Sequence, residues 1–154
     1  MTTPTKPAQR PLKDMVQEFM KMIDTFSALL THETDALKKS DFAVVDTFQA
    51  DKKLMAADYN SMVSALAERR AEWAEMDPVL RDKLVAQRDA FSIVLDDNMK
   101  ALERAQNSVK RLVNHILDAA RAAVAAEQKG AYSATGTAVM SRSATSSLAT
   151  DQVL

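Results

Sequence analysis

The sequence contains no cysteine, which excludes disulfide bonds, thiol nucleophiles and cysteine metal ligands. It has two glycines and four prolines in 154 residues, and two of the prolines, Pro4 and Pro7, lie in a polar N-terminal segment. Residues that break helices are therefore scarce in the middle of the chain. Aromatic residues make up 5% of the chain, which argues against a core built on a β-sheet. Since alanine, leucine, lysine, glutamate and methionine favour helices, these absences predict an all-α protein.

A strong charge of either sign is also missing, because 20 basic and 21 acidic residues leave a net charge of −1. Such a balance does not favour binding to nucleic acid or to an anionic membrane surface. The N-terminus has no apolar signal-peptide region, and no run of about 18 apolar residues occurs. We therefore expect no secretory signal, no membrane insertion and a cytoplasmic location.

Residue patterns that support catalysis or metal binding are absent as well. His32 is followed by Glu33, but no second histidine completes an H-E-x-x-H zinc motif. Neither His32 nor His115 has a glutamate three residues earlier, as the ligands of a di-iron bundle require. Both glycines lie near the C-terminus, so the helical region has no glycine-rich phosphate loop. The sequence predicts a protein that is not an enzyme and binds no cofactor or metal, with both histidines on solvated or half-buried helix faces.

Apolar residues recur at steps of three and four along most of the chain, which is the period of an amphipathic helix. The pattern predicts a helical bundle over residues 12–129, with helices at about 12–39, 41–76 and 78–129. A flexible N-terminus at 1–11 and a flexible tail at 130–154 are expected on either side, because small polar residues dominate there.

Five residues mark the expected helix boundaries. Pro11 can open the first helix, since proline suits a first turn. Ser40 is a candidate N-cap for the second helix. Asp77 and Pro78 form a start signal for the third helix, with an acidic cap followed by proline at the first helical position. Gly130 is expected to follow the end of the third helix as its C′ residue.

The third predicted helix carries a heptad pattern, in which apolar residues alternate at steps of four and three. One member of this seam, Asn98, is polar. A buried asparagine in such a seam costs stability but can set the register and the number of partners. Alternatively, Asn98 faces solvent where helices cross, and the sequence leaves both possibilities open. The seam consists of Leu84, Phe91, Leu95, Asn98, Leu102, Ala105, Val109, Leu112, Ile116, Ala119 and Ala123.

The three predicted helices differ in length, at roughly 40, 54 and 75 Å for a rise of 1.5 Å per residue. Short connections make neighbouring helices antiparallel, so we expect an elongated antiparallel helical bundle or coiled coil with a long third helix. The first two helices are too short to cover all of the third, which predicts an exposed apolar seam at 109–126. Such a seam needs a partner in water, either another protein or a second copy in a homodimer. The alternative is that the first helix covers it. The residues proposed to take a partner are Val109, Leu112, Val113, Ile116, Leu117 and Ala120.

Within the expected tail, Tyr132 is the one large side chain close to the end of the third predicted helix. A tyrosine there can serve as an anchor in a partner's pocket at a low cost in conformational entropy. Alternatively, it packs back on the last helical turn as the hydrophobic contact of a C-cap. The sequence does not decide between these two roles.

Several residues together resemble the FlgN family of bacterial flagellar export chaperones. This family has a Glu and a Leu near the end of its first helix, basic residues in the second, asparagines in the long third helix and a Tyr-Gly-Ala-x-Gly-like element before a polar tail. The chain has Ser133 where that element usually has glycine. The resemblance covers about residues 15–137. The matching residues are Glu33, Leu37, Lys52, Lys53, Arg69, Arg70, Asn98, Asn107 and the stretch Tyr132, Ser133, Ala134, Thr135 and Gly136.

The resemblance implies a cytoplasmic chaperone for flagellar type III export. Members of the family bind the C-terminal helical segments of hook-associated proteins, which form the hook–filament junction. They prevent premature assembly and deliver these subunits to the export gate. By this resemblance, the C-terminal helical region would take the substrate and Tyr132 would take part in docking to the export gate. The alternative function is a structural or scaffolding coiled-coil protein that self-associates.

Overall fold

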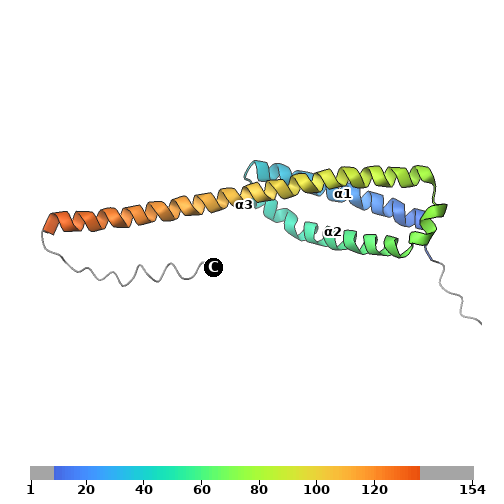
Figure 1. Ribbon diagram of the computed structural model, residues 1–154, viewed down its shortest axis with the longest axis horizontal. Helices are drawn as coiled ribbons and strands as arrows, with labels where there is room; N and C mark the ends of the chain where they lie inside the picture. The colour runs from blue at the N-terminus through green and yellow to red at the C-terminus, as the bar shows by residue number, and fades with distance from the viewer. Residues whose placement is uncertain (1–8, 136–154) are drawn as a thin grey trace, which may run out of the picture. The chain divides into compact units, whose positions relative to one another are not determined.

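The computed structural model describes residues 9–135, with side chains described as far as Tyr132. Every element in this part of the chain is helical: α1 (Leu12–Lys38), α2 (Phe42–Glu68), the 3₁₀ helix η1 (Arg70–Glu75) and α3 (Pro78–Thr135) (Figure 1). The all-α prediction and the long third helix are confirmed. The expected N-terminal segment lies mostly outside the described residues, as does the tail from residue 136 onward. The chain divides into two compact units, Met1–Ser108 and Val109–Leu154, and α3 contributes to both.

The core of the first unit is organised by α1, which buries one continuous face. Val16, Ile23 and Leu30 are spaced seven residues apart and are at most 1% exposed. This spacing returns side chains to nearly the same side of a helix after two turns. The face is completed by other apolar side chains at steps of three and four, Leu12, Phe19, Phe26, Leu29 and Leu37.

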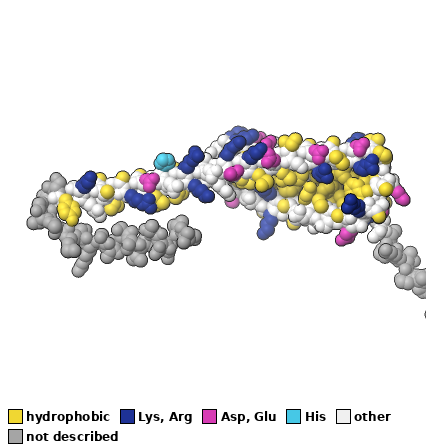
Figure 2. Space-filling model, in the orientation of Figure 1, with side chains coloured by type: hydrophobic (Ala, Val, Ile, Leu, Met, Phe, Trp, Pro, Cys, Tyr) yellow, Lys and Arg dark blue, Asp and Glu magenta, His cyan; other side chains and the backbone are white. Residues whose placement is uncertain are grey.

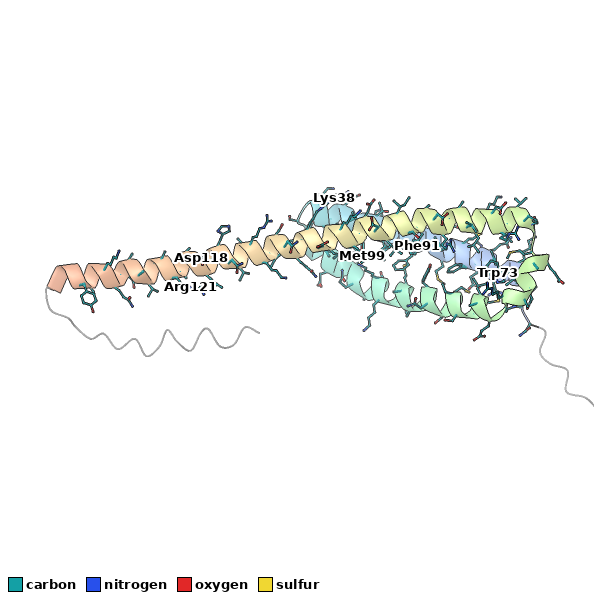
Figure 3. All side chains as sticks on the ribbon, in the orientation of Figure 1. Lys38, Trp73, Phe91, Met99, Asp118 and Arg121 are labelled. Carbon is teal, nitrogen blue, oxygen red and sulfur yellow. The ribbon has the colours of Figure 1, made fainter. Side chains whose placement is uncertain are left out.

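Aromatic side chains from three helices meet in this core. The Tyr59 ring of α2 lies 5.3 Å from the Phe19 ring of α1 and 5.3 Å from the Phe91 ring of α3, measured between ring centroids. Phe26 lies 5.4 Å from Phe91. Figure 3 labels Phe91 on the part of α3 that lies alongside α1 and α2. Tilted pairs at these distances add about 0.5–1.5 kcal/mol each beyond the area they bury, so this cluster ties the three helices together.

A smaller apolar cluster continues the core at the other end of the first unit. It joins the end of α1 and the start of α2 to Ala101 on α3, and it includes Leu37 and Val45. Leu102 and Ala105 pack against it and are half-buried. Beyond Ala105, every described side chain of α3, at residues 106–132, is exposed.

Two predicted helix starts have different outcomes. Asp77 caps α3 as predicted, because its Oδ1 accepts a hydrogen bond from the Val79 N–H at 3.0 Å. The assignment of Ser40 as the cap of the second helix is wrong. Asp41 is the N-cap of α2, and its Oδ1 accepts from the Val44 N–H at 3.2 Å. Ser40 instead has a φ of 56° and turns the chain between α1 and α2.

The second helix is interrupted earlier than the predicted range 41–76. The α-helix ends at Glu68, and 3₁₀ geometry follows at Arg70–Glu75. The Trp73 indole N–H donates to the Leu66 carbonyl at 3.2 Å, and the Arg69 backbone N–H donates to the same carbonyl at 3.2 Å. Because these donors occupy the carbonyl that would continue the α-helix, the chain tightens into 3₁₀ turns.

The predicted helix end at Gly130 is also wrong, because α3 continues to Thr135 and so includes the first residues of the expected tail. A glycine inside a helix costs about 1 kcal/mol relative to alanine, which does not stop a helix flanked by strong helix formers. Lys129 and Ala131, the two neighbours of Gly130, are such residues. A Cβ at this position would meet nothing within 4 Å, so close packing does not require the glycine either.

Candidate partner-binding surface

Asn98 is buried, which decides between its two predicted environments. Its side chain is 2% exposed and lies among residues of α1 and α2. The Asn98 Nδ2 donates to Glu33 Oε2 at 2.7 Å and to Thr34 Oγ1 at 3.2 Å. The Asn98 Oδ1 accepts from Lys52 Nζ at 3.1 Å. Because Asn98 is buried within one chain and bonded to both other helices, it sets the register of α3 against α1 and α2.

Glu33 is the centre of this network and is completely buried. Its Oε2 lies 2.7 Å from Lys52 Nζ, and its Oε1 accepts from Gln49 Nε2 at 2.7 Å. Burial by itself raises the pKa of the Glu33 carboxyl. The hydrogen bonds from Lys52, Asn98 and Gln49, together with the Lys52 charge, outweigh burial and lower this pKa below its ordinary value of 4.5. Glu33 is therefore ionised and paired at neutral pH.

Three of the residues that carry the family resemblance, Glu33, Lys52 and Asn98, are thus brought together inside the first unit. Their role there is to hold three helices in register. A fourth, Arg69, is also engaged within the chain: its guanidinium lies 2.5 Å from the Glu72 carboxylate and 2.6 Å from the Arg10 carbonyl oxygen. The pairings of Glu33 with Lys52 and Asn98 could not be read from sequence spacing, because these residues lie on three different helices, whereas Arg69 and Glu72 are only three residues apart.

The predicted substrate surface lies on the second unit, where α3 presents its apolar residues to solvent. Leu112 and Ile116 are each 60% exposed. At 3.6 residues per turn, the apolar residues from Val109 to Val124 cover an arc of about 160° around the helix. Such an arc is wide enough for a partner helix to pack against it. The other exposed apolar side chains on the arc are Val109, Val113, Leu117, Ala119, Ala120, Ala123 and Val124.

The opposite side of the same helix is polar. Arg121 Nη1 donates to Asp118 Oδ1 at 3.3 Å, and both side chains are about 70% exposed, at 68% and 72% (Figure 3). Arg111 lies near the same side by helical spacing. This segment of α3 is therefore amphipathic, with one apolar face and one charged face.

Tyr132 is 67% exposed and belongs to α3. Packing of this ring against the last helical turn, one of its two predicted roles, is not observed among the side chains described up to residue 132. At 100° per residue, Tyr132 is rotated by about 140° from Val109, which places it outside the apolar arc. The two predicted partner residues, Ile116 and Tyr132, therefore belong to different faces of the helix.

The described residues offer no alternative site of the kinds considered from the sequence. Both histidines are exposed on helices. Within residues 9–135, no group of three or more histidine, aspartate or glutamate side chains is arranged to hold a metal ion. Among the helices of this same part, none is long and apolar enough to cross a membrane.

Comparisons with protein-family models, with curated proteins and with solved structures found no match for this chain. The resemblance to flagellar export chaperones therefore depends on the residues quoted for it. Several of those residues have structural roles in the first unit, whereas the apolar residues of α3 beyond Ala105 are exposed.

Proposed function

We propose that this protein is a cytoplasmic flagellar export chaperone. In this proposal, it binds the C-terminal helical segment of a hook-associated protein, prevents premature assembly and delivers that subunit to the export gate. The observation that carries the proposal is the exposed apolar face of α3, with Leu112 and Ile116 each 60% exposed. Together with the resemblance of the chain to the FlgN family, this face favours a partner-binding protein.

The chemistry of the face suits an amphipathic helix as the partner. A helix laid against it would place apolar side chains at i, i+3, i+4 and i+7 between those of α3, in a coiled-coil-like packing. Complete burial of a leucine or isoleucine side chain is worth about 1.5–3 kcal/mol. Leu112, Ile116 and Leu117 together can therefore offset the cost of ordering a segment that is unfolded before it binds.

Tyr132 is proposed to act separately, in docking to the export gate. Its position outside the apolar arc supports this separation, because a helix packed on Ile116 would leave the tyrosine ring accessible. An exposed aromatic ring is a common anchor in protein interfaces.

A calorimetric titration of the full chain with the C-terminal segment of a hook-associated protein tests the proposal. We expect one-to-one binding that is lost in Ile116→Asp, because an aspartate on the apolar face would have to be desolvated in the complex. Ala122→Asp is a matched control, since it adds the same residue on the polar side of the same exposed helix. Binding that survives in Ile116→Asp would show that the partner uses another surface.

The same apolar face also favours a second candidate function, self-association as a structural coiled coil. In that case two copies would pack through Leu112 and Ile116 in the absence of any other protein. Light scattering across a range of concentrations separates the two candidates. A dimer that Ile116→Asp dissociates, with no binding to hook-associated segments, would favour the structural role.

A further inference from the structure

An open apolar groove runs between α2 and α3 in the first unit, well apart in sequence from the surface proposed for the substrate. Its volume is ≈ 480 Å³. Figure 2 shows hydrophobic side chains gathered over this part of the molecule. The groove is lined mainly by Phe19, Tyr59, Val63, Trp73 and Val85, with Arg70 and Arg88 as its charged members.

The groove exists because α2 and α3 do not close over the face of α1. α1 buries eleven of its residues, whereas α2 buries two, Val45 and Leu66. Val63 on α2 and Val85 on α3 remain 41% and 43% exposed, although both lie beside the aromatic core. Three helical segments thus share a core that has room for a fourth on one side.

The walls of the groove are held in place by contacts within the chain. The Trp73 ring is oriented by the hydrogen bond from its indole N–H to the Leu66 carbonyl, at 3.2 Å. Tyr59 is held between Phe19 and Phe91, with ring centroids 5.3 Å away on each side. A partner would therefore meet a preformed apolar surface, which lowers the cost of binding.

The charge of the groove selects among possible partners. Arg70 is exposed and forms no ion pair with any residue that the structure describes. Arg88 has one distant pair, 3.4 Å to Asp89, and these side chains are 61% and 67% exposed. Such an exposed pair holds the arginine weakly. Both guanidinium groups are thus available to carboxylates on a partner, in contrast to the neighbouring Arg69, which is engaged by Glu72.

We propose that this groove docks an acidic amphipathic helix of a partner protein. Leucine-like side chains at i, i+3, i+4 and i+7 would fill the space beside Tyr59 and Trp73, completing a four-helix arrangement. Glutamate or aspartate residues flanking them would pair with Arg70 and Arg88.

The helix at residues 109–132 of this chain, or of a second copy, does not fit this description. It carries four basic and two acidic residues, a net charge of +2. Placing it beside Arg70 and Arg88 would bring like charges together, which disfavours that pairing. We therefore assign the groove to a different protein, at a site separate from the surface proposed for the substrate.

The chain contains one tryptophan, Trp73, so its fluorescence reports directly on the groove. The experiment titrates the full chain with a helix-stabilised synthetic peptide that has leucines on one face and glutamates beside them. A twin peptide with lysine in place of every glutamate is the matched probe. We expect the acidic peptide to change the Trp73 emission and to bind at least about tenfold more tightly than its twin at low salt.

Charge reversal in the protein gives the second half of the test. The double variant Arg70→Glu and Arg88→Glu should reverse the preference between the two peptides, and both residues are exposed, so circular dichroism should stay unchanged. Ile116→Asp should bind the acidic peptide as the unmodified chain does. Equal binding of both peptides, no change in Trp73 emission or loss of binding in Ile116→Asp would overturn the proposal. So would a dimer, detected by light scattering, that the double variant dissociates.

Discussion

Replacement of Lys52 by methionine should turn the buried network around Glu33 from a stabilising feature into a destabilising one. The Lys52 ammonium lies 2.7 Å from the Glu33 carboxylate, which is completely buried. Methionine keeps most of the length of the side chain but removes the charge and the donor. Glu33 would keep the hydrogen bonds from Asn98 and Gln49. We therefore expect the free energy of unfolding to fall by about 3 kcal/mol, at the low end of the range for a broken buried ion pair.

The pH dependence of this loss gives the sharper test. In the unmodified protein the pKa of Glu33 lies below 4.5, so the unfolded chain binds the proton more tightly. The contribution of Glu33 to stability is therefore fully present above about pH 4.5 and is lost as the pH falls through the lower, folded-state pKa. Without Lys52, burial should raise the folded-state pKa above the unfolded one. The variant should then regain part of its lost stability as the pH falls from 7 toward 5, because protonation removes the unpaired charge.

Urea denaturation followed by circular dichroism at pH 7 and pH 5 measures the loss of unfolding free energy and its dependence on pH. Groups far from the network titrate alike in the two proteins, so their effects cancel when the variant is compared with the unmodified protein. Lys53→Met is the control, since Lys53 is exposed, and it should leave stability within about 0.5 kcal/mol. If Lys52→Met lowered the unfolding free energy equally at both pH values, or more at pH 5, Glu33 would not be an unpaired buried charge in the variant. A double variant, Lys52→Met with Glu33→Gln, should recover part of the loss, because no buried charge remains unpaired.

Three further predictions concern individual residues of α3. Phe91→Ala should destabilise the first unit by about 3–5 kcal/mol in the same assay, because Phe91 is 2% exposed and contacts the aromatic rings of α1 and α2. A loss below about 1 kcal/mol would mean that the helices do not share this core. Gly130→Ala should slow amide hydrogen exchange around residue 130, with a gain of about 1 kcal/mol in local helix stability. Faster exchange would instead indicate that Gly130 is the C′ residue expected from the sequence, in the left-handed conformation that such a residue adopts. Tyr132→Ala should keep the affinity for a hook-associated segment and weaken docking to the export gate, and unchanged gate affinity would remove Tyr132 from the proposed function.

The heptad seam shows which structural features a sequence pattern can predict and which it cannot. From Leu84 to Ala105 its members are buried or half-buried, and from Val109 onward they are exposed, although the spacing is the same in both parts. Periodicity records which side of a helix is apolar, and it does not record what lies against that side. The candidate surface around Ile116 could therefore be named from the sequence as a set of residues, while its exposure depended on the positions of other helices.

The features that could be predicted from the sequence alone are local. Helical periods, the scarcity of glycine and proline and the start signal at Asp77 and Pro78 were sufficient for the all-α class and the long third helix, because these depend on interactions within a few turns. The packing of the helices determined the partners of Asn98, the burial of Glu33 and the open groove beside Trp73. Each of these depends on groups far apart in the chain, such as Glu33 and Lys52, whose contact follows from the packing of one helix on another and leaves no periodic mark in the sequence.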